Sequence, residues 1–202
     1  MPIYKLFPEP VYFSKLERTL TKTELKTIAQ FKKNTYKNIG NLTTHDTYIL
    51  EHKTLKQLKK DLYTMVVDYF NKIICTTDSV TPYITQSWIN YTELNEQHHR
   101  HAHANSYISG VFYIDARREV DKIKFFRDKY TRLQLSTKKH NPFNSTNWWF
   151  PVETGDIILF PSYLVHGVEP KQGINTRTSL AFNVFIKGEI GSKLDLTELT
   201  LS

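Results

Sequence analysis

A change of hydrophobic period near residue 80 constrains the fold more than any other feature of the sequence. From there on, short segments rich in β-branched and aromatic residues alternate with polar residues, glycine or proline, a pattern typical of β-strands. Many short strands at this spacing predict a sandwich or barrel over about residues 80–187. The predicted strands are 83–94, 107–114, 122–127, 156–160, 164–168 and 176–186.

Two helices are predicted before this region. Thr21 and Glu24 fit a capping box, in which each side chain bonds to the backbone of the other, and a helix over about 22–33 follows. A second helix, over about 53–74, is indicated by apolar residues at helical spacing with lysines off the apolar stripe. A length of 202 residues with 40% hydrophobic composition predicts a single domain (1–202). Together with the predicted strands and helices, this indicates a mainly β fold with flanking helices.

A polar, basic stretch without a clear period, residues 129–147, separates two groups of predicted strands. A loop of this length in a compact domain is usually functional or disordered, so we consider it a candidate lid. The chain has 27 Lys and Arg against 20 Asp and Glu, and its net charge of +7 favours an anionic substrate or a polyanion. Nucleic-acid binding is the less favoured alternative, because a solvated strand edge or a lid accounts for the same charge. That alternative would rest on Arg117, Arg118, Lys122, Lys124, Arg127, Lys129, Arg132, Lys138 and Lys139.

The sequence predicts a soluble, cytoplasmic protein. The single cysteine, Cys75, cannot form an intramolecular disulfide, and its apolar neighbours predict a buried structural thiol. Lys5, Pro8 and Glu9 interrupt the N-terminal segment, so a signal peptide is not expected. No segment approaches the roughly 18 to 20 apolar residues that span a bilayer, so we expect no membrane partner.

Four of the eight histidines lie in the run QHHRHAHANS. Side chains alternate along an extended strand, so His99, His101 and His103 are expected to point to one face. Neutral imidazoles spaced in this way can bind one transition metal ion, such as iron, zinc, copper or nickel. A solvated histidine run is the alternative interpretation.

Two residues further along the chain extend this interpretation. His166 follows a strongly apolar strand and a proline break, where a lone histidine is more often a satisfied core residue than a ligand. Arg177, eleven residues later, begins another alternating apolar strand. An arginine that points into a barrel requires an anionic partner, and its planar fork matches a carboxylate.

Several motifs accompany these residues, and as a set they are specific although each alone is weak. They are His101-Ala-His103-Ala-Asn-Ser106, Ser109–Ile114, Gly155–Ser162, His166–Pro170, Arg177–Ser179 and Phe182-Asn183, together with Leu6-Phe7-Pro8 and the strand of Trp88. This set resembles a family of 2-oxoglutarate/iron(II) oxygenases common in marine bacteria and their phages. The resemblance implies a double-stranded β-helix, a jelly-roll barrel with the helices packed outside.

The resemblance also implies an activity and a set of functional residues. The activity is that of a dioxygenase that uses iron(II), 2-oxoglutarate and O2 to hydroxylate a small-molecule or peptide substrate, with succinate and carbon dioxide as co-products. The implied metal ligands are His101, His103 and His166, and Arg177 is implied to bind the C5 carboxylate of 2-oxoglutarate.

Four hydroxyl side chains are further candidates for the cosubstrate. Tyr107, Ser109 and Tyr113 belong to the strand after the histidines, and Ser179 shares the strand face of Arg177.

The residue at position 103 departs from the usual pattern. Non-haem iron oxygenases typically use two histidines and one carboxylate, whereas the carboxylate position here is His103. We favour a three-histidine site over a carboxylate supplied by Glu96, Asp115 or Glu169. His99 is either a spare ligand or a solvated residue. The alternative function is that of a cupin-like three-histidine dioxygenase, or a metal-binding jelly-roll module, that does not use 2-oxoglutarate.

Overall fold

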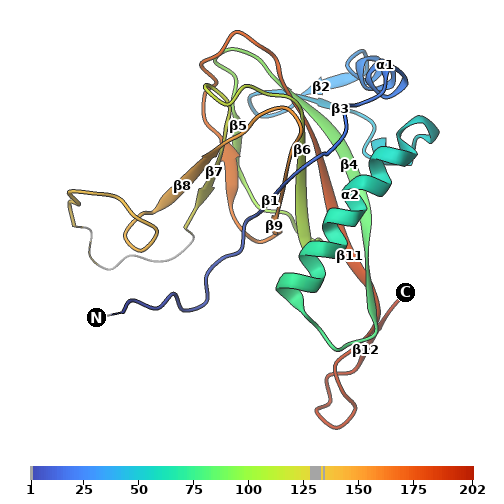
Figure 1. Ribbon diagram of the computed structural model, residues 1–202, viewed down its shortest axis with the longest axis vertical. Coiled ribbons are helices and arrows are strands. Elements are labelled where there is room, and N and C mark those ends of the chain that lie inside the picture. Colours follow the sequence, from blue (N-terminus) through green and yellow to red (C-terminus); the bar gives the residue numbers. More distant parts are fainter. Residues whose placement is uncertain (1, 128–132, 134) are drawn as a thin grey trace.

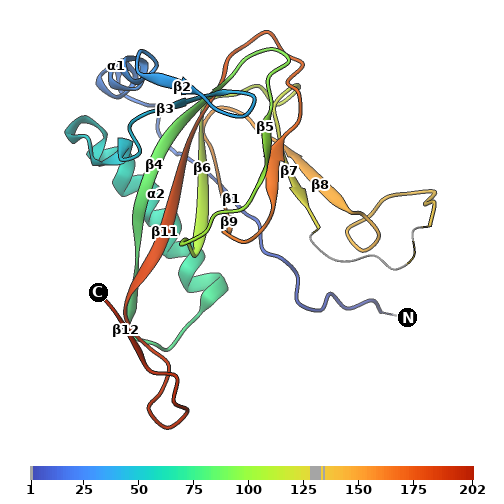
Figure 2. The same cartoon turned by 180° about the vertical axis from the view of Figure 1, so that it is seen from behind.

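The computed structural model describes residues 2–127, 133 and 135–202 and consists mainly of β-strands. Two sheets face each other, and the helices cover the outer side of the larger sheet (Figure 1). The view from behind shows the same layers, with the smaller sheet on the side away from the helices (Figure 2). The predicted jelly-roll arrangement is therefore confirmed. Of the predicted lid at 129–147, residues 129–132 and 134 lie outside the described residues, and the lid stays a prediction.

The larger sheet holds the longest strands, β4 and β11, side by side, and its neighbouring strands pair antiparallel. Its order is β1 (Tyr12–Lys15), β9 (Asp156–Pro161), β6 (Ile108–Asp115), β11 (Arg177–Ile190), β4 (Val80–Thr92), β3 (Leu42–Thr44) and β2 (Thr35–Lys37), and β12 (Leu199–Leu201) also pairs with β11. The smaller sheet has the order β5 (His98–His101), β10 (His166–Val168), β7 (Lys122–Phe126) and β8 (Asn147–Pro151).

Strand β9 shows how one strand contributes to two cores. Ile157 and Leu159 are buried in the cluster formed with the helices, whereas Ile158 and Phe160 are buried in the cluster formed with the smaller sheet. Successive side chains of a strand point to opposite faces, so a strand covered on both sides is apolar throughout. The continuous apolar run in the sequence therefore places β9 between the two layers.

Helix α1 (Lys22–Phe31) begins at the predicted capping box. The Thr21 hydroxyl accepts a hydrogen bond from the backbone N–H of Glu24 at 3.2 Å, and the Glu24 carboxylate accepts one from the Thr21 backbone at 2.7 Å. A short 3₁₀ turn, η1 (Ile49–Glu51), precedes the second helical region.

The second predicted helix is present as three consecutive pieces. They are a 3₁₀ turn, η2 (Lys53–Leu55), the helix α2 (Lys56–Tyr69) and a π-helical turn, η3 (Phe70–Ile74). Cys75 follows in the left-handed conformation and is exposed, so the prediction of a buried thiol is wrong.

Five short strands, β1, β2, β3, β8 and β12, were not predicted from the sequence. Each has three to five residues and lies at or near a sheet edge, where the hydrophobic pattern is too short to reveal a period. No helix among the described residues is long and apolar enough to cross a membrane.

Candidate metal centre

Antiparallel pairing in the smaller sheet brings the distant His166 to the histidine run. His166 on β10 is the register partner of His101 on β5, and their ring centroids lie 4.4 Å apart. The ring of His103 lies 5.0 Å from that of His101 and 5.2 Å from that of His166. Each of the three residues offers a ring nitrogen, and these nitrogens lie within 4.8 Å of one another. Small side-chain movements would bring all three onto one ion.

Backbone carbonyls fix the orientation of two of these rings. Nδ1 of His101 donates to the carbonyl of His99 at 2.8 Å, and Nδ1 of His166 donates to the carbonyl of Leu164 at 3.0 Å. Since Nδ1 carries the proton in each ring, Nε2 keeps a lone pair for a metal. The donor set therefore fits a transition metal ion.

Burial keeps all three imidazoles neutral. It lowers the pKa of His103 to about 4 and that of His166 to about 3, and it also lowers the pKa of His101. A neutral imidazole is the form that binds a metal, so these ligands need not lose a proton near neutral pH.

Aromatic side chains hold two of the rings in place. Trp88 on β4 stacks on His103, with centroids 5.6 Å apart and an interplanar angle of 27°. Phe160 on β9 meets His166 edge-on at 4.7 Å. Both aromatic residues belong to the larger sheet, so the two layers together position the histidines.

Arg177 is buried in the same pocket without an anionic partner. Its side chain is on the first residue of β11, and the residue is 3% exposed. Nη2 donates to the hydroxyl of Tyr113 at 3.4 Å, whereas Nε has no hydrogen-bond partner. Among the described residues, no carboxylate forms a salt bridge with this guanidinium. A buried, unpaired guanidinium is costly, so the site fits a ligand that carries a carboxylate.

The pocket between the two sheets contains the histidines and the arginine together. Polar and aromatic side chains of the larger sheet, and His98 of β5, line it as well. The residues that line it include Trp88, Asn90, His98, His101, His103, Ser109, His166, Arg177 and Ser179.

The cosubstrate candidates differ in position. Ser179 lines the pocket two residues after Arg177, as predicted from strand alternation. Tyr113 is fully buried behind the guanidinium, with its ring 5.1 Å from the Arg177 Cζ. Tyr107 is 41% exposed and is not among the lining residues. The geometry therefore supports a direct contact of Ser179 with a cosubstrate and an indirect role of Tyr113 through Arg177. Tyr107 does not line the pocket.

The carboxylates considered as alternative ligands lie elsewhere. Glu96 accepts a hydrogen bond from the backbone of Glu93, Glu169 pairs with Lys124, and Asp115 is exposed. Among the described residues, the groups that could hold a metal consist of histidines alone.

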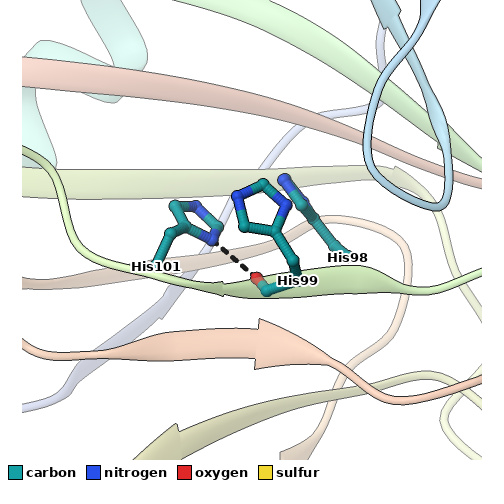
Figure 3. Close-up of side chains that lie close together, drawn as sticks. All are labelled: His98, His99 and His101. Atoms are coloured by element: carbon teal, nitrogen blue, oxygen red, sulfur yellow. Dashed lines mark hydrogen bonds between the residues drawn. The ribbon is translucent and has the colours of Figure 1, made fainter.

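The histidine run departs from regular alternation at His98, whereas His99, His101 and His103 lie close together as predicted, with the ring of His101 4.9 Å from that of His99 and 5.0 Å from that of His103. Strand β5 ends at His101, and His103 follows it, held by a hydrogen bond from its backbone N–H to the Ser162 carbonyl at 2.9 Å. Pairing with β10 shifts register between His101 and His98, which is a β-bulge. The bulge turns His98 to the same side as His101, where alternation would place them on opposite faces, so His98 joins the histidines that were expected to share one face (Figure 3).

Sequence reasoning did not place three polar or aromatic residues in the pocket, namely Trp88, Asn90 and His98. His98 is placed by the bulge, for which Gly167 on the partner strand is the one local signal. A Cβ at Gly167 would lie 3.0 Å from the His98 carbonyl and 3.2 Å from that of His99. The contact of Trp88 depends on packing between sheets and has no signal in the sequence.

The chain was compared with protein families and with proteins of known structure. The family model described as "Putative 2OG-Fe(II) oxygenase" matches residues 86–183. These residues include the histidines, Arg177 and Ser179. The comparison with curated proteins found no match.

Three solved structures illustrate the structural similarity. An oxidoreductase of the 2OG-Fe(II) oxygenase family from Burkholderia pseudomallei is 16% identical, with 85% of this chain and 83% of that chain covered and a TM-score of 0.56. HygX from Streptomyces hygroscopicus, with nickel, 2-oxoglutarate and hygromycin B bound, is 13% identical over 85% and 82%, with a TM-score of 0.57. A prolyl hydroxylase from Trichoplax adhaerens, in complex with a hypoxia inducible factor peptide, is 9% identical over 87% and 83%, with a TM-score of 0.61. At these identities the likeness shows the shared fold.

Proposed function

We propose that this protein, whose residues 86–183 match the 2OG-Fe(II) oxygenase family model, is a dioxygenase that hydroxylates a small-molecule or peptide substrate. In this proposal His101, His103 and His166 bind iron(II), and Arg177 binds the C5 carboxylate of 2-oxoglutarate. The observation that carries the proposal is the buried, unpaired Arg177 in the pocket that the three histidines line. A metal-binding module without an anionic cosubstrate would have no use for this guanidinium.

Bound iron(II) supplies the oxidative chemistry, in which 2-oxoglutarate and O2 yield succinate and carbon dioxide while a substrate C–H bond is hydroxylated. The protein's own residues contribute orientation. The carbonyls of His99 and Leu164 hold His101 and His166 with Nε2 free. Trp88 covers one face of His103, which limits the approach of water to that ligand.

Arg177 and Ser179 would orient the far end of the cosubstrate. The guanidinium can form two parallel hydrogen bonds to one carboxylate, which fixes its direction as well as its position. The Ser179 hydroxyl lies two residues along on the same strand face and can donate to the same group. The Tyr113 hydroxyl, 3.4 Å from Nη2, supports the guanidinium from behind.

Three neutral imidazoles leave the metal centre one negative charge short of the usual two-histidine, one-carboxylate set. We propose that this site binds iron(II) through three histidines and that the bound 2-oxoglutarate supplies the negative charge. Metal selectivity over zinc, nickel and copper is then weaker than in a carboxylate-containing site, because affinity alone follows the Irving–Williams order.

We further propose an anionic substrate and a cytoplasmic location. Lys122 lies over the ring of Trp149 at 4.4 Å and Arg100 lies over that of Phe126 at 3.8 Å, so the smaller sheet presents cations held on aromatic faces. The free cysteine, Cys75, fits a reducing compartment.

The experiment is an assay of 2-oxoglutarate turnover. Protein loaded anaerobically with iron(II) is exposed to O2, and succinate formation is measured with and without 2-oxoglutarate for the wild type, Arg177→Met and Arg118→Met. We expect succinate from the wild type and from the exposed control Arg118→Met. In Arg177→Met we expect the KM for 2-oxoglutarate to rise about 30-fold or more, since losing a buried charged partner costs roughly 2–5 kcal/mol.

Two outcomes contradict the proposal. An unchanged KM in Arg177→Met removes the assigned role of the arginine. Oxygen consumption without any requirement for 2-oxoglutarate would instead support the alternative function considered in the sequence analysis, a three-histidine dioxygenase that does not use 2-oxoglutarate.

A further inference from the structure

A second group of three histidines lies beside the proposed iron ligands and shares His101 with them. His98, His99 and His101 each offer a ring nitrogen, and these nitrogens lie within 4.8 Å of one another. Their ring centroids are 4.6 to 5.2 Å apart. Figure 3 shows the three rings gathered on one side of β5, where regular alternation would separate His98 from His101.

The β-bulge in β5 creates this group. The register shift opposite His166 and Val168 brings His98 round to the face of His101. Arg100 turns the other way, and its guanidinium lies 3.8 Å from the ring centroid of Phe126. The group is therefore built by the backbone and does not depend on chance rotamers at a frayed strand end.

The two added histidines have little bonding of their own. Nδ1 of His99 is buried and has no hydrogen-bond partner. Nε2 of His98 lies 3.5 Å from Nδ2 of Asn38, at the outer limit of a hydrogen bond. A buried polar atom without a partner is costly, and a ligand that bonds to it would recover that cost.

We propose that His98, His99 and His101 form a second position for a late first-row transition metal ion, such as Zn²⁺, Ni²⁺ or Cu²⁺, which competes with the iron position for His101. Imidazole suits these ions, and the group contains no carboxylate that would favour a harder cation. This binding does not depend on the proposed oxygenase function, whereas the competition rests on the proposed iron site.

The competition follows from the hydrogen bond of His101. Its Nδ1 donates to the His99 carbonyl at 2.8 Å, so Nε2 alone has a free lone pair. Both triads need that lone pair, and one ion at a time can have it. An ion in the second position would leave only two imidazoles, those of His103 and His166, for the iron position. The protein would then lack an intact iron site.

Zinc binding by full-length variants tests the position. His166→Ala removes one iron ligand and leaves the second group whole. We expect this variant to bind one Zn²⁺ per chain, measured by competition with a chromophoric chelator. Adding His98→Asn and His99→Asn to it should weaken zinc binding about 100-fold or more, since loss of even an outer partner of a metal ligand costs about 10- to 100-fold. Adding His140→Ala, an exposed histidine, is the matched control and should change nothing.

Zinc binding that is absent from His166→Ala, or equal in the variant that also carries His98→Asn and His99→Asn, would overturn the proposal. A second measurement uses the wild type and does not depend on the folding of a multiple variant. Zn²⁺ added to iron-loaded protein should release iron, followed with an iron(II) chelator, and His98→Asn/His99→Asn alone should slow the release about tenfold or more. Equal release rates would overturn the competition. Neither assay measures succinate. A negative result for zinc binding therefore does not contradict the proposed hydroxylation, and a negative turnover assay does not contradict the proposed zinc position.

Discussion

The two sheets of this protein differ in what their buried residues do. In the larger sheet, long strands bury apolar side chains against α2 on one face and against the smaller sheet on the other. In the smaller sheet, strands of three to five residues carry His98, His99, His101 and His166. The difference teaches that the larger sheet provides stability and the smaller one provides metal ligands, with Arg177 reaching from the first toward the second. Substitutions in the two layers should therefore have separable effects.

The largest effect is expected at a ligand in the smaller sheet. His166→Ala should lower succinate formation by more than about 100-fold, because it removes a proposed iron ligand and outer partners alone account for about 10- to 100-fold. The measurement is 2-oxoglutarate turnover, with circular dichroism to check the fold. Turnover within a factor of a few of the wild type would break the assignment of catalysis to the smaller sheet.

A substitution in the core between α2 and the larger sheet should lower stability without changing cosubstrate binding. Leu62→Ala in α2 removes a fully buried side chain and should lower the free energy of unfolding by about 2–5 kcal/mol. The KM for 2-oxoglutarate should not change at temperatures where the variant is folded. Leu25→Ala, at a 47% exposed position of α1, is the control and should cost less than about 0.5 kcal/mol in denaturant unfolding. A raised KM in Leu62→Ala would show that the two layers are coupled.

Arg177 belongs to the larger sheet by position and to the pocket by function, so its replacement sharpens the comparison. Arg177→Met should raise the stability of the cosubstrate-free protein by about 1–3 kcal/mol, because it removes a buried charge without an anionic partner. It should also abolish the rise in Tm that 2-oxoglutarate gives the wild type. Thermal unfolding with and without 2-oxoglutarate measures both effects. Lower stability without cosubstrate would mean that the guanidinium is already compensated.

A further effect is a dependence of stability on pH that arises from the buried histidines of the pocket. Burial lowers the pKa of His103 to about 4 and that of His166 to about 3, from a usual value of 6.5. Between the lowered pKa values of the folded protein and the usual value of 6.5, the unfolded chain therefore binds more protons than the folded metal-free protein. The free energy of unfolding then falls as pH drops from about 6.5 toward 4. Urea midpoints at pH 7 and pH 5 measure this fall.

A histidine variant identifies the source of that pH dependence. His103→Gln should reduce it, because one of the buried imidazoles is removed, whereas His140→Gln, at an exposed histidine, should leave it unchanged. An equal slope in His103→Gln would show that His103 is not one of the responsible groups.

The fold and the capping of the helices could be predicted because local patterns determine them. The apolar run of β9 predicts a strand covered on both faces, and Thr21 with Glu24 predicts where α1 begins. The short edge strands could not be predicted, because three to five residues show no reliable period and their pairing depends on the neighbouring strand.

The residues of the site were predicted from their chemistry, but their arrangement was not. A histidine run, a lone histidine after an apolar strand and an arginine inside another are visible in the sequence, and they suffice to predict a transition metal ion with an anionic ligand. The position of His98 could not be predicted, because the bulge opposite Gly167 is a property of the pairing between β5 and β10.

The pattern of the sequence by itself predicted a sandwich or barrel, a histidine run that suits a transition metal and an arginine that requires an anion, because these depend on residue type and on the order of apolar segments. The jelly roll and the set of three ligands followed from the resemblance to the oxygenase family. The tertiary structure decided which imidazoles meet. It placed His166 opposite His101, set Trp88 on His103, and turned His98 into the pocket. These contacts arise between strands far apart in the chain, where register and bulges, and not local sequence, set the direction of each side chain.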